Sequence, residues 1–528
     1  MKKILISVLA CVAFASCKLD VIPENAITFP SYFKTEQDFS SVMYQMLSAS
    51  KHFYDHLPQQ YAGELMDHVR TGSWANLRAF NPVDIRQKAN WKVRYDVIYI
   101  ANIILENTFR GEDAGIPAGR LAFYEGQANF SKAWMYFELS RYWGEAIITD
   151  GTRTDIPYPK SSMMDVIGEA IRCGELAWEQ LPRYADMKNY NGVAMRSKQM
   201  GNKGSVAALL AHAYAWRGSL IDFYGVEGYD SGEDYRQSIF WASEVIEGRA
   251  GSYSLEPTTE ALVTRGLRGT LATSVVTNDT PESILELETD INDIPNLYSF
   301  VKTYHGYPFL PTTLTAAAHY LNVNCGITAS LLDRTYVFDD QERDMRLPSF
   351  FFDGTSSGFA AWDWDAARTL QMVFPRKLRY VQTEAASYNP SLQILRTWLA
   401  NTVYFRLADI ILLRAECNVK LGNDGPAVID LNTVRTRAGV AGYPAGRGDG
   451  DLQMAVFRER EKEMAMEGHR FFDIIRNGYH RLPGMLPEAW ASLSDRDIAA
   501  GAYFLPIGEG AFRRNDLMRQ NAYWIRID

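Results

Sequence analysis

Two pairs of acidic residues are close enough in sequence to act together. Asp290 and Asp293 form one pair, and Asp363 and Asp365 form the other. Paired carboxylates can act as general acid and base in glycoside hydrolysis, or as oxygen ligands for calcium. However, sequence spacing does not fix the distance between two carboxyl groups, and acidic residues are common in this chain. Neither pair by itself indicates an enzyme.

The other reactive groups favour structural roles over catalysis. His305 lies among tyrosines and reads as a polar contact in an aromatic loop. The charged stretch 467–473 is expected on an amphipathic helix that begins near Ala455, where Glu467 and Arg470 can pair at i, i+3. The sequence has no H-E-x-x-H motif, no P-loop and no cluster of cysteines and histidines. These features make no positive case for an enzyme, a metal or a cofactor.

Periodic apolar residues predict a mainly helical chain. An example is the stripe of Leu407, Ile410, Ile411 and Ala415. Helices are expected at about 91–109, 121–142, 161–181, 203–222, 233–247, 407–421 and 424–438. The pairs 90–142, 161–222 and 405–438 read as hairpins, whereas 233–247 has no clear partner. Hairpins of this kind resemble tetratricopeptide repeats, which bury their apolar faces by stacking on neighbours.

Residues 250–400 lose the helical period and are rich in glycine, proline and aromatic residues. Examples are the strings at 304–309 (YHGYPF) and 362–364 (WDW). A long irregular stretch inside a folded chain is usually functional rather than connective. The expected organisation is one all-α domain over 17–528. Its helical scaffold spans about 35–250 and 400–480, with a loop-rich insertion at about 250–400.

Composition excludes several classes of protein. The 528 residues carry 54 Lys and Arg against 63 Asp and Glu, a formal charge of −9, which argues against a nucleic-acid surface. Hydrophobic residues make up 47% of the chain, enough for a large core, and aromatic residues 13%. Trp134, Trp178, Trp216 and Trp241 sit in helical patterns and are expected in that core.

The N-terminus reads as an export signal. Lys2 and Lys3 precede an apolar run over 4–15, and Ala15 and Ser16 lead to Cys17. This arrangement resembles the lipobox of bacterial lipoproteins, although Phe14 stands where leucine is usual. It implies a signal peptide over 1–16 and a lipid anchor on Cys17.

Several further segments together resemble one family. They are LDVIPENAIT at 19–28, RYWG at 141–144, KGSVAALLA at 203–211, RLAD at 406–409, NTVRTRAG at 432–439, EGHRFFD at 467–473, LPI at 505–507 and QN at 520–521. In order and spacing the chain is similar to the SusD/RagB family of outer-membrane nutrient-binding lipoproteins. The match is weakest over 250–400, and Gly508 replaces the usual proline after Pro506-Ile507.

This resemblance implies a lipid-anchored protein on the surface of the outer membrane. Such a protein captures a glycan without cleaving it and delivers it to a TonB-dependent, SusC-like transporter. Two alternatives remain open. One is a RagB-like protein that takes up peptides, and the other is a surface glycoside hydrolase.

Candidate ligand residues combine flat rings with polar side chains. Sugar rings pack their apolar faces on aromatic rings, while their hydroxyls need polar partners. The segment 64–76, which lies where the family draws ligand residues, offers Trp74 for stacking and Asp67, Arg70 and Asn76 for hydroxyls. The irregular region would add Tyr304, Tyr307, Trp362 and Trp364.

Overall fold

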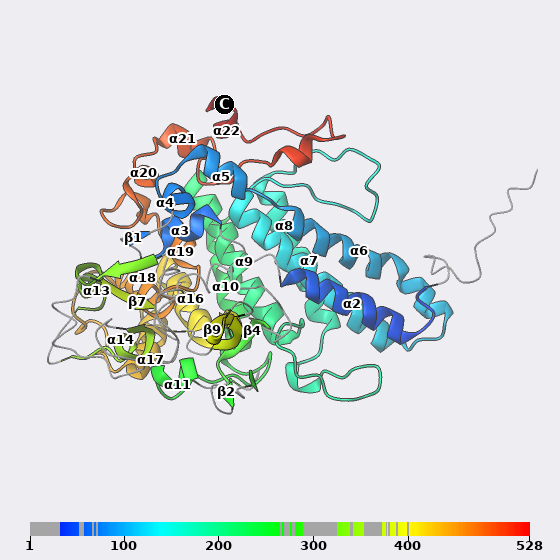
Figure 1. Ribbon diagram of the computed structural model, residues 1–528, viewed down its shortest axis with the longest axis horizontal. Coiled ribbons are helices and arrows are strands. Elements are labelled where there is room, and N and C mark those ends of the chain that lie inside the picture. Colours follow the sequence, from blue (N-terminus) through cyan, green and yellow to red (C-terminus); the bar gives the residue numbers. More distant parts are fainter. Residues whose placement is uncertain are drawn as a thin grey trace, which may run out of the picture.

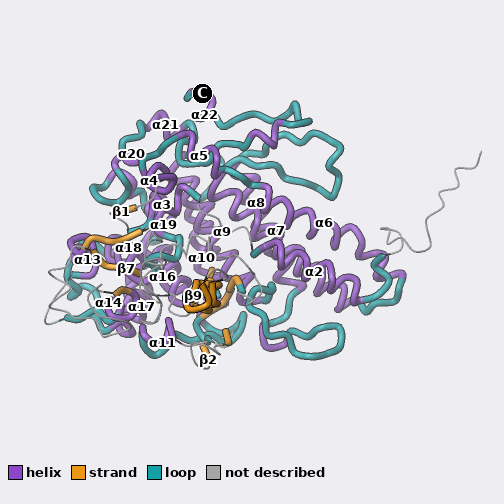
Figure 2. The backbone as a smooth tube through the Cα atoms, viewed as in Figure 1, coloured by secondary structure: helices purple, strands orange, loops and turns teal. Residues whose placement is uncertain are grey.

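The fold is mainly helical, and an insertion in the second half of the chain contains short strands (Figures 1 and 2). The computed structural model describes residues 32–51, 57–65, 68–69, 72–264, 267–268, 275–276, 280–288, 325–337, 342–352, 372–375, 377, 381–386, 389–398 and 401–527. The principal helices are α2 (Glu36–Ser50), α6 (Lys92–Asp113), α7 (Ala118–Trp143), α8 (Met163–Gln180), α9 (Lys203–Tyr224), α10 (Ser231–Ile246), α16 (Leu407–Lys420), α17 (Asp424–Ala438) and α18 (Leu452–Glu463). No described helix is both long and apolar enough to span a bilayer.

Consecutive helices pack as antiparallel hairpins. Helix α6 packs on α7, α7 on α8, α8 on α9 and α9 on α10, and α2 lies against α6 and α7 (Figure 1). The side chains of Thr35, Ser162 and Asn202 form capping boxes that begin α2, α8 and α9. Because each hairpin covers its apolar face with the next, the scaffold is built by stacking.

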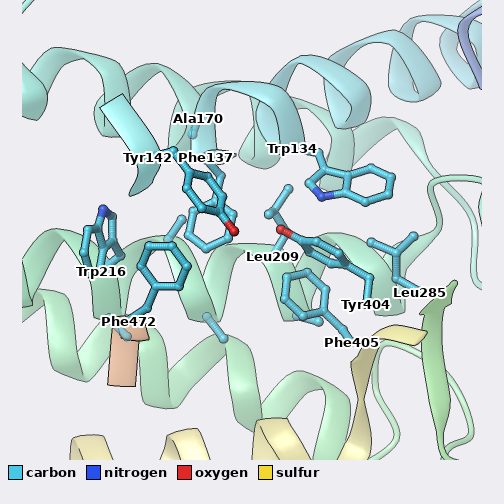
Figure 3. Close-up of a cluster of buried hydrophobic side chains, with 14 of the residues drawn as sticks. Trp134, Phe137, Tyr142, Ala170, Leu209, Trp216, Leu285, Tyr404, Phe405 and Phe472 are labelled. Carbon is cyan, nitrogen blue, oxygen red and sulfur yellow. The ribbon is translucent and has the colours of Figure 1, made fainter. Parts of the chain in front are cut away.

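The core lies around α7 and α9, which are buried on nearly all sides. Trp134 on α7 meets Tyr404 edge-on, with ring centroids 4.9 Å apart (Figure 3). Trp216 on α9 packs against Phe472, with centroids 5.6 Å apart. Segments separated by hundreds of residues therefore share one aromatic core.

The second half of the chain leaves the scaffold and returns to it at one place. Strand β4 (Ser283–Leu287) pairs antiparallel with β10 (Thr402–Arg406), so Ser283 lies opposite Arg406. Beyond this ribbon, α10 packs on α16, and α16 packs on α17 and α18. The helix at 233–247, for which the sequence shows no clear partner, therefore packs both on α9 before the insertion and on α16 after it.

Short strands organise the described parts of the insertion. Strands β1 (His68–Val69), β5 (Cys325–Thr328), β7 (Met372–Pro375) and β6 (Phe351–Phe352) form a four-stranded sheet in that order. The other described elements are β2 (Leu267–Arg268), β3 (Val275–Val276), β8 (Val381–Ala386), β9 (Asn389–Trp398), α11 (Thr259–Thr264), α13 (Ala329–Tyr336) and α14 (Arg346–Phe350). The predicted irregular region therefore contains local β-structure.

The scaffold agrees with the sequence-based expectation. Each predicted helix is present, and Trp134, Trp216 and Trp241 are buried, while Trp178 is partly buried against the core. Two details differ. Helix α2 was not predicted, and the expected helix through 467–473 is interrupted, because α18 ends at Glu463 and α19 (Arg470–Arg476) begins after a turn.

Candidate functional site

The predicted ligand segment near residue 70 is held by a cluster of short helices. These are α3 (Pro58–Gly63), α4 (Gly72–Arg78) and α5 (Pro82–Lys88). Pro82 occupies the first turn of α5, and the Asn81 side chain caps it. Arg78 donates to the Tyr61 carbonyl at 3.0 Å, and Trp490 donates through Nε1 to the Leu77 carbonyl at 3.1 Å. The first bond joins α4 to α3 within the cluster, and the second ties the end of α4 to the buried Trp490.

Trp74 is half-buried on α4. Its ring packs against the fully buried Tyr61, with centroids 5.2 Å apart and planes at 51°. The core therefore supports the indole, and part of its surface stays accessible. A supported, partly open ring suits stacking because little side-chain freedom is lost on binding.

Asn76 lies two residues further along α4 and is oriented by α5. Its Nδ2 donates to Asp84 Oδ2 at 2.9 Å. Asp84 is itself held, because its backbone N–H donates to the Asn81 side chain at 3.2 Å. The Asn76 amide plane is thus set by a neighbouring helix.

The remaining predicted ligand residues lie outside the described part of the chain. They are Asp67, Arg70, Tyr304, Tyr307, Trp362 and Trp364, and the lipidation candidate Cys17 lies outside it too. The same holds for both acidic pairs. A G-x-S-x-G string at 354–358 also falls there.

The backbone nevertheless joins the predicted ligand segment 64–76 to the described part of the insertion. His68 pairs with Gly326 and Val69 with Cys325, so β1 joins the sheet of the insertion. Strand β7 is bonded to both β5 and β6. The stretch with Trp362 and Trp364 connects β6 to β7, and β1 stands between Asp67 and Arg70 in the sequence. Sequence periodicity could not reveal this pairing, because a two-residue strand carries no period.

A buried ion network fastens the insertion to the C-terminal helices. Arg346 Nη2 lies 2.7 Å from Asp344 Oδ2, and Arg346 Nη1 lies 2.5 Å from Glu459 Oε1. Lys377 Nζ lies 2.6 Å from Glu467 Oε1. All these groups are buried or nearly so, and each charge faces an opposite one. The insertion is thus held by charge as well as by strand pairing.

Arg406, the last residue of β10, extends this network. It binds Glu282 at 2.9 Å, Glu463 at 2.6 Å and Glu467 at 2.9 Å. Arg437 on α17 also pairs with Glu282 and Glu463. Through these contacts Arg406 and Arg437 tie β10 and α17 to the end of α18 and to the residue before β4.

The network shifts the pKa values of its carboxyl groups. Burial alone would raise the pKa of Glu459, but the charges of Arg346, Lys462 and Arg435 lower it to about 2. Glu463 is likewise buried, yet Arg437, Arg406 and Arg346 hold its pKa far below the ordinary value. Such groups stay ionised at neutral pH and act as permanent anchors rather than as proton donors.

The stretch 467–473 has the expected structural role with different partners. The prediction that Glu467 pairs with Arg470 is wrong. Glu467 binds Arg406 and Lys377, while Arg470 binds Glu461 at 2.6 Å. The physical reason is the turn between α18 and α19, because of which these two residues do not share the i, i+3 geometry of one helix.

In the part of the chain that the structure describes, no group of three or more His, Cys, Asp or Glu could hold a metal ion.

Two family profiles match the chain. The SusD family profile matches residues 366–524, and a profile described as starch-binding and associating with the outer membrane matches residues 19–214. The chain belongs to the SusD-like family. The second match contains the Trp74 segment, and the first contains β10 and the charged C-terminal helices.

Curated relatives include two SusD-like proteins of Formosa agariphila. SusD-like protein P38 is 22% identical over 509 residues, covering 87% of this chain and 88% of its own. SusD-like protein P25 is 37% identical over 81 residues, which is 15% of either chain.

Solved structures match this SusD-like chain over nearly its whole length. Two SusD homologues from Bacteroides thetaiotaomicron superpose with TM-scores of 0.70 and 0.71 at 20% and 18% identity. The matches cover 93% and 94% of this chain and 98% of each homologue. A structure described as a laminarin-binding SusD-like protein matches with a TM-score of 0.64 at 18% identity, over 92% of this chain and 98% of its own. The helical-hairpin fold is therefore the SusD-like fold.

Proposed function

We propose that this SusD-like protein captures oligosaccharides or polysaccharides at the bacterial cell surface without cleaving them. Lipid-anchored through Cys17 to the outer membrane, it passes them to a TonB-dependent, SusC-like transporter. The match to a starch-binding, outer-membrane profile and the likeness to a laminarin-binding protein support this proposal.

The observation that carries the proposal is the pairing of β1 with β5, because β1 belongs to the same sequence segment as the supported indole of Trp74. It connects the Trp74 segment to the aromatic-rich insertion. In the proposed site Trp74, Tyr304, Tyr307, Trp362 and Trp364 stack on sugar rings. Asp67, Arg70 and Asn76 bind hydroxyls.

Several rings are needed because each contributes little. Covering ~40 Å² of apolar surface contributes about 1 kcal/mol, which is less than association itself costs. Several rings together with hydrogen bonds to hydroxyls are therefore needed for even roughly millimolar affinity, which corresponds to a net binding free energy of about 4 kcal/mol. The site therefore favours a chain of several sugars over a single one.

The first test is affinity electrophoresis against a polysaccharide panel that includes laminarin and starch. We expect one of these polysaccharides to retard the protein, and the Trp74→Ala variant to bind it roughly five- to tenfold more weakly, the loss of one stacked ring. Phe240→Ala is the matched control, because Phe240 is 50% exposed on α10, outside this segment. Unchanged retardation of Trp74→Ala would remove residues 67–76 from the site.

A parallel assay separates capture from hydrolysis and from peptide uptake. Incubating the retarding polysaccharide with the protein should release no reducing ends. Release would overturn the non-catalytic proposal. Retardation by no glycan, with binding to a peptide mixture, would replace it with the peptide-uptake alternative.

A further inference from the structure

The turn between α18 and α19, residues 464–469, is bound by other segments on two sides. Met464, Ala465 and Met466 are buried, and Met466 has a positive φ of 64°. Gly468 follows with a φ of 84°. A non-glycine residue in this left-handed region is strained and persists only where its surroundings hold it. The contacts that the turn makes with other segments are therefore part of what fixes its shape.

One side of the turn holds the beginning of the predicted ligand segment. The buried carboxylate of Glu64 accepts the backbone N–H of Met466 at 2.9 Å and that of Gly468 at 2.8 Å. Arg470, the first residue of α19, donates to the Gly63 carbonyl at 2.5 Å. Glu64 lies four residues before β1, so these bonds fix the chain shortly before that strand begins.

The other side of the turn holds the insertion. The side chain of Glu467 lies between the two N–H groups in sequence, and its Oε1 is 2.6 Å from Lys377 Nζ. Lys377 also donates to the Glu463 carbonyl at 3.0 Å, and its Nζ lies 4.1 Å from the centroid of the buried Phe350 ring. Lys377 follows β7 by two residues, so these contacts fix the chain shortly after that strand ends.

These links form a closed chain of contacts. From the turn it passes through Glu64 to β1, by strand pairing from β1 to β5 and from β5 to β7, and through Lys377 back to Glu467 of the turn. Strand β1 has two residues and β5 and β7 have four each, so the strand pairing alone supplies few hydrogen bonds. The two anchors on the turn therefore limit how far β1 and β7 can move apart.

We infer that Glu64 and Lys377 are positioning residues for the proposed glycan site, coupled to each other through the turn 464–469. Both roles rest on the proposed function, since neither residue is among those proposed to touch the glycan. Because the chain of contacts is closed, the loss of either anchor loosens both β1 and β7.

Hydrogen exchange of the intact protein without ligand tests the coupling by itself. Lys377→Met removes the anchor of the insertion, while Glu467 keeps its second partner, Arg406. We expect amide exchange in the peptide that contains β1, on the other side of the turn, to become at least about threefold faster. Glu64→Ala should likewise accelerate exchange in the peptide that contains β7.

Controls separate this coupling from a general loss of stability. Lys92→Met is the matched control, because Lys92 is an exposed lysine on α6 that also pairs with a carboxylate, and it should change neither peptide. Exchange in α8 should stay slow in every variant, which shows that the helical scaffold is folded. Lys377→Met carries the test if Glu64→Ala does not fold.

Affinity electrophoresis then tests the link to binding. Glu64→Ala and Lys377→Met should each bind the retarding polysaccharide roughly three- to tenfold more weakly, as expected for the loss of buried hydrogen bonds. The double variant should bind about as weakly as either single variant, because both changes open the same chain of contacts. Glu64→Gln keeps an acceptor for one of the two N–H groups and should recover most of the binding.

The effect across the turn decides the outcome. Faster exchange in β1 caused by Lys377→Met, together with weaker polysaccharide binding, supports the inference. Faster exchange confined to the strand beside the changed residue would overturn it, and so would full binding by both variants when a polysaccharide retards the parent protein. If no polysaccharide retards the parent protein, the proposed function fails, and the exchange experiment still decides whether the two anchors are coupled.

Discussion

Asp84 is a positioning residue for the proposed glycan site. It touches Asn76 through one hydrogen bond and holds the amide from the neighbouring helix. A side chain fixed in this way loses less freedom on binding, so in the proposed site the hydrogen bond of Asn76 to a sugar hydroxyl would be worth more.

We therefore predict that Asp84→Ala weakens polysaccharide binding about as much as Asn76→Ala, roughly two- to tenfold. The double variant should be no weaker than either single one, because both changes remove the same oriented amide. Asp84→Asn, which keeps an acceptor, should retain most of the binding. Additive losses in affinity electrophoresis would show that Asp84 acts elsewhere.

Burial shifts the pKa values of two residues, Glu64 and His469, in opposite directions. Burial raises the pKa of Glu64 to about 7, although the backbone N–H groups of Met466 and Gly468 donate to it. Burial lowers the pKa of His469 to about 4, and it lowers the pKa of His212 too. Asp409, Asp473 and Arg460 are the charged groups that surround His469.

The sign of each pH effect on stability depends on whether the folded or the unfolded chain binds the proton more tightly. Between about pH 4.5 and 7 the folded chain binds the Glu64 proton more tightly than the unfolded chain, so acidification stabilises the fold. Between about pH 6.5 and 4 the unfolded chain binds the His469 proton more tightly, so acidification destabilises it. Each shift corresponds to about 3 kcal/mol, and the two effects largely offset each other.

We predict that Glu64→Gln exposes the histidine effect. Its free energy of unfolding should fall by up to about 3 kcal/mol between pH 7 and 4.5, whereas the parent protein should change much less. His469→Gln should shift the dependence the other way. Urea unfolding at a series of pH values measures both slopes, and parallel curves for all three proteins would contradict the prediction.

At the scale of elements, α3 and α19 approach each other too closely for a side chain. A Cβ on Gly63 would lie 2.4 Å from the backbone nitrogen of Phe471. Gly168, inside α8, has open space around the same position.

Gly63→Ala should therefore destabilise the protein by about 1–3 kcal/mol, because the two helices must separate. Gly168→Ala should stabilise it by about 0.5–1 kcal/mol, since alanine loses less backbone entropy in a helix. Thermal unfolding of the two variants compares the same chemical change in two settings. Equal shifts of the melting temperature for the two variants would contradict the close approach of α3 and α19.

Sequence periodicity predicted the elements that carry a period. The paired helices α6 and α7 and the pair α16 and α17 repeat apolar residues every three or four positions. The strands β1, β5, β6 and β7 have two to four residues each, too short for any pattern. Their pairing depends on tertiary contacts, which is why the second half of the chain read as irregular.

At the scale of the whole molecule, Glu463 joins segments from across the chain. It faces Arg346 of the insertion, Arg406 of β10 and Arg437 of α17. All four side chains are buried, so removing the carboxylate leaves cations without compensation.

Glu463→Gln should lower the free energy of unfolding by about 3–5 kcal/mol. The control Glu233→Gln removes an exposed carboxylate that pairs with Arg236 at 2.9 Å, and it should change stability by less than about 0.5 kcal/mol. Guanidinium unfolding measures the free energy of unfolding of both variants. A small loss for Glu463→Gln would contradict the conclusion that the Glu463 carboxylate holds these segments together.

The candidate site was only partly predictable. Trp74 and Asn76 stood out by residue type, and the structure shows a supported ring and an oriented amide. The role of Asp84 could not be read from the sequence, because it depends on how α4 meets α5.

Because the aromatic-rich insertion begins and ends at the ribbon of β4 and β10, it can be replaced as a unit. Its departure and return points are adjacent strands, so its length can vary at little cost in closure entropy. A transplant from another SusD-like protein needs to match this ribbon and to supply equivalents of Asp344, Arg346 and Lys377. Under the proposed function, a new insertion would therefore change the preferred sugar. The stacked helices, and any surface they offer to other proteins, would stay unchanged.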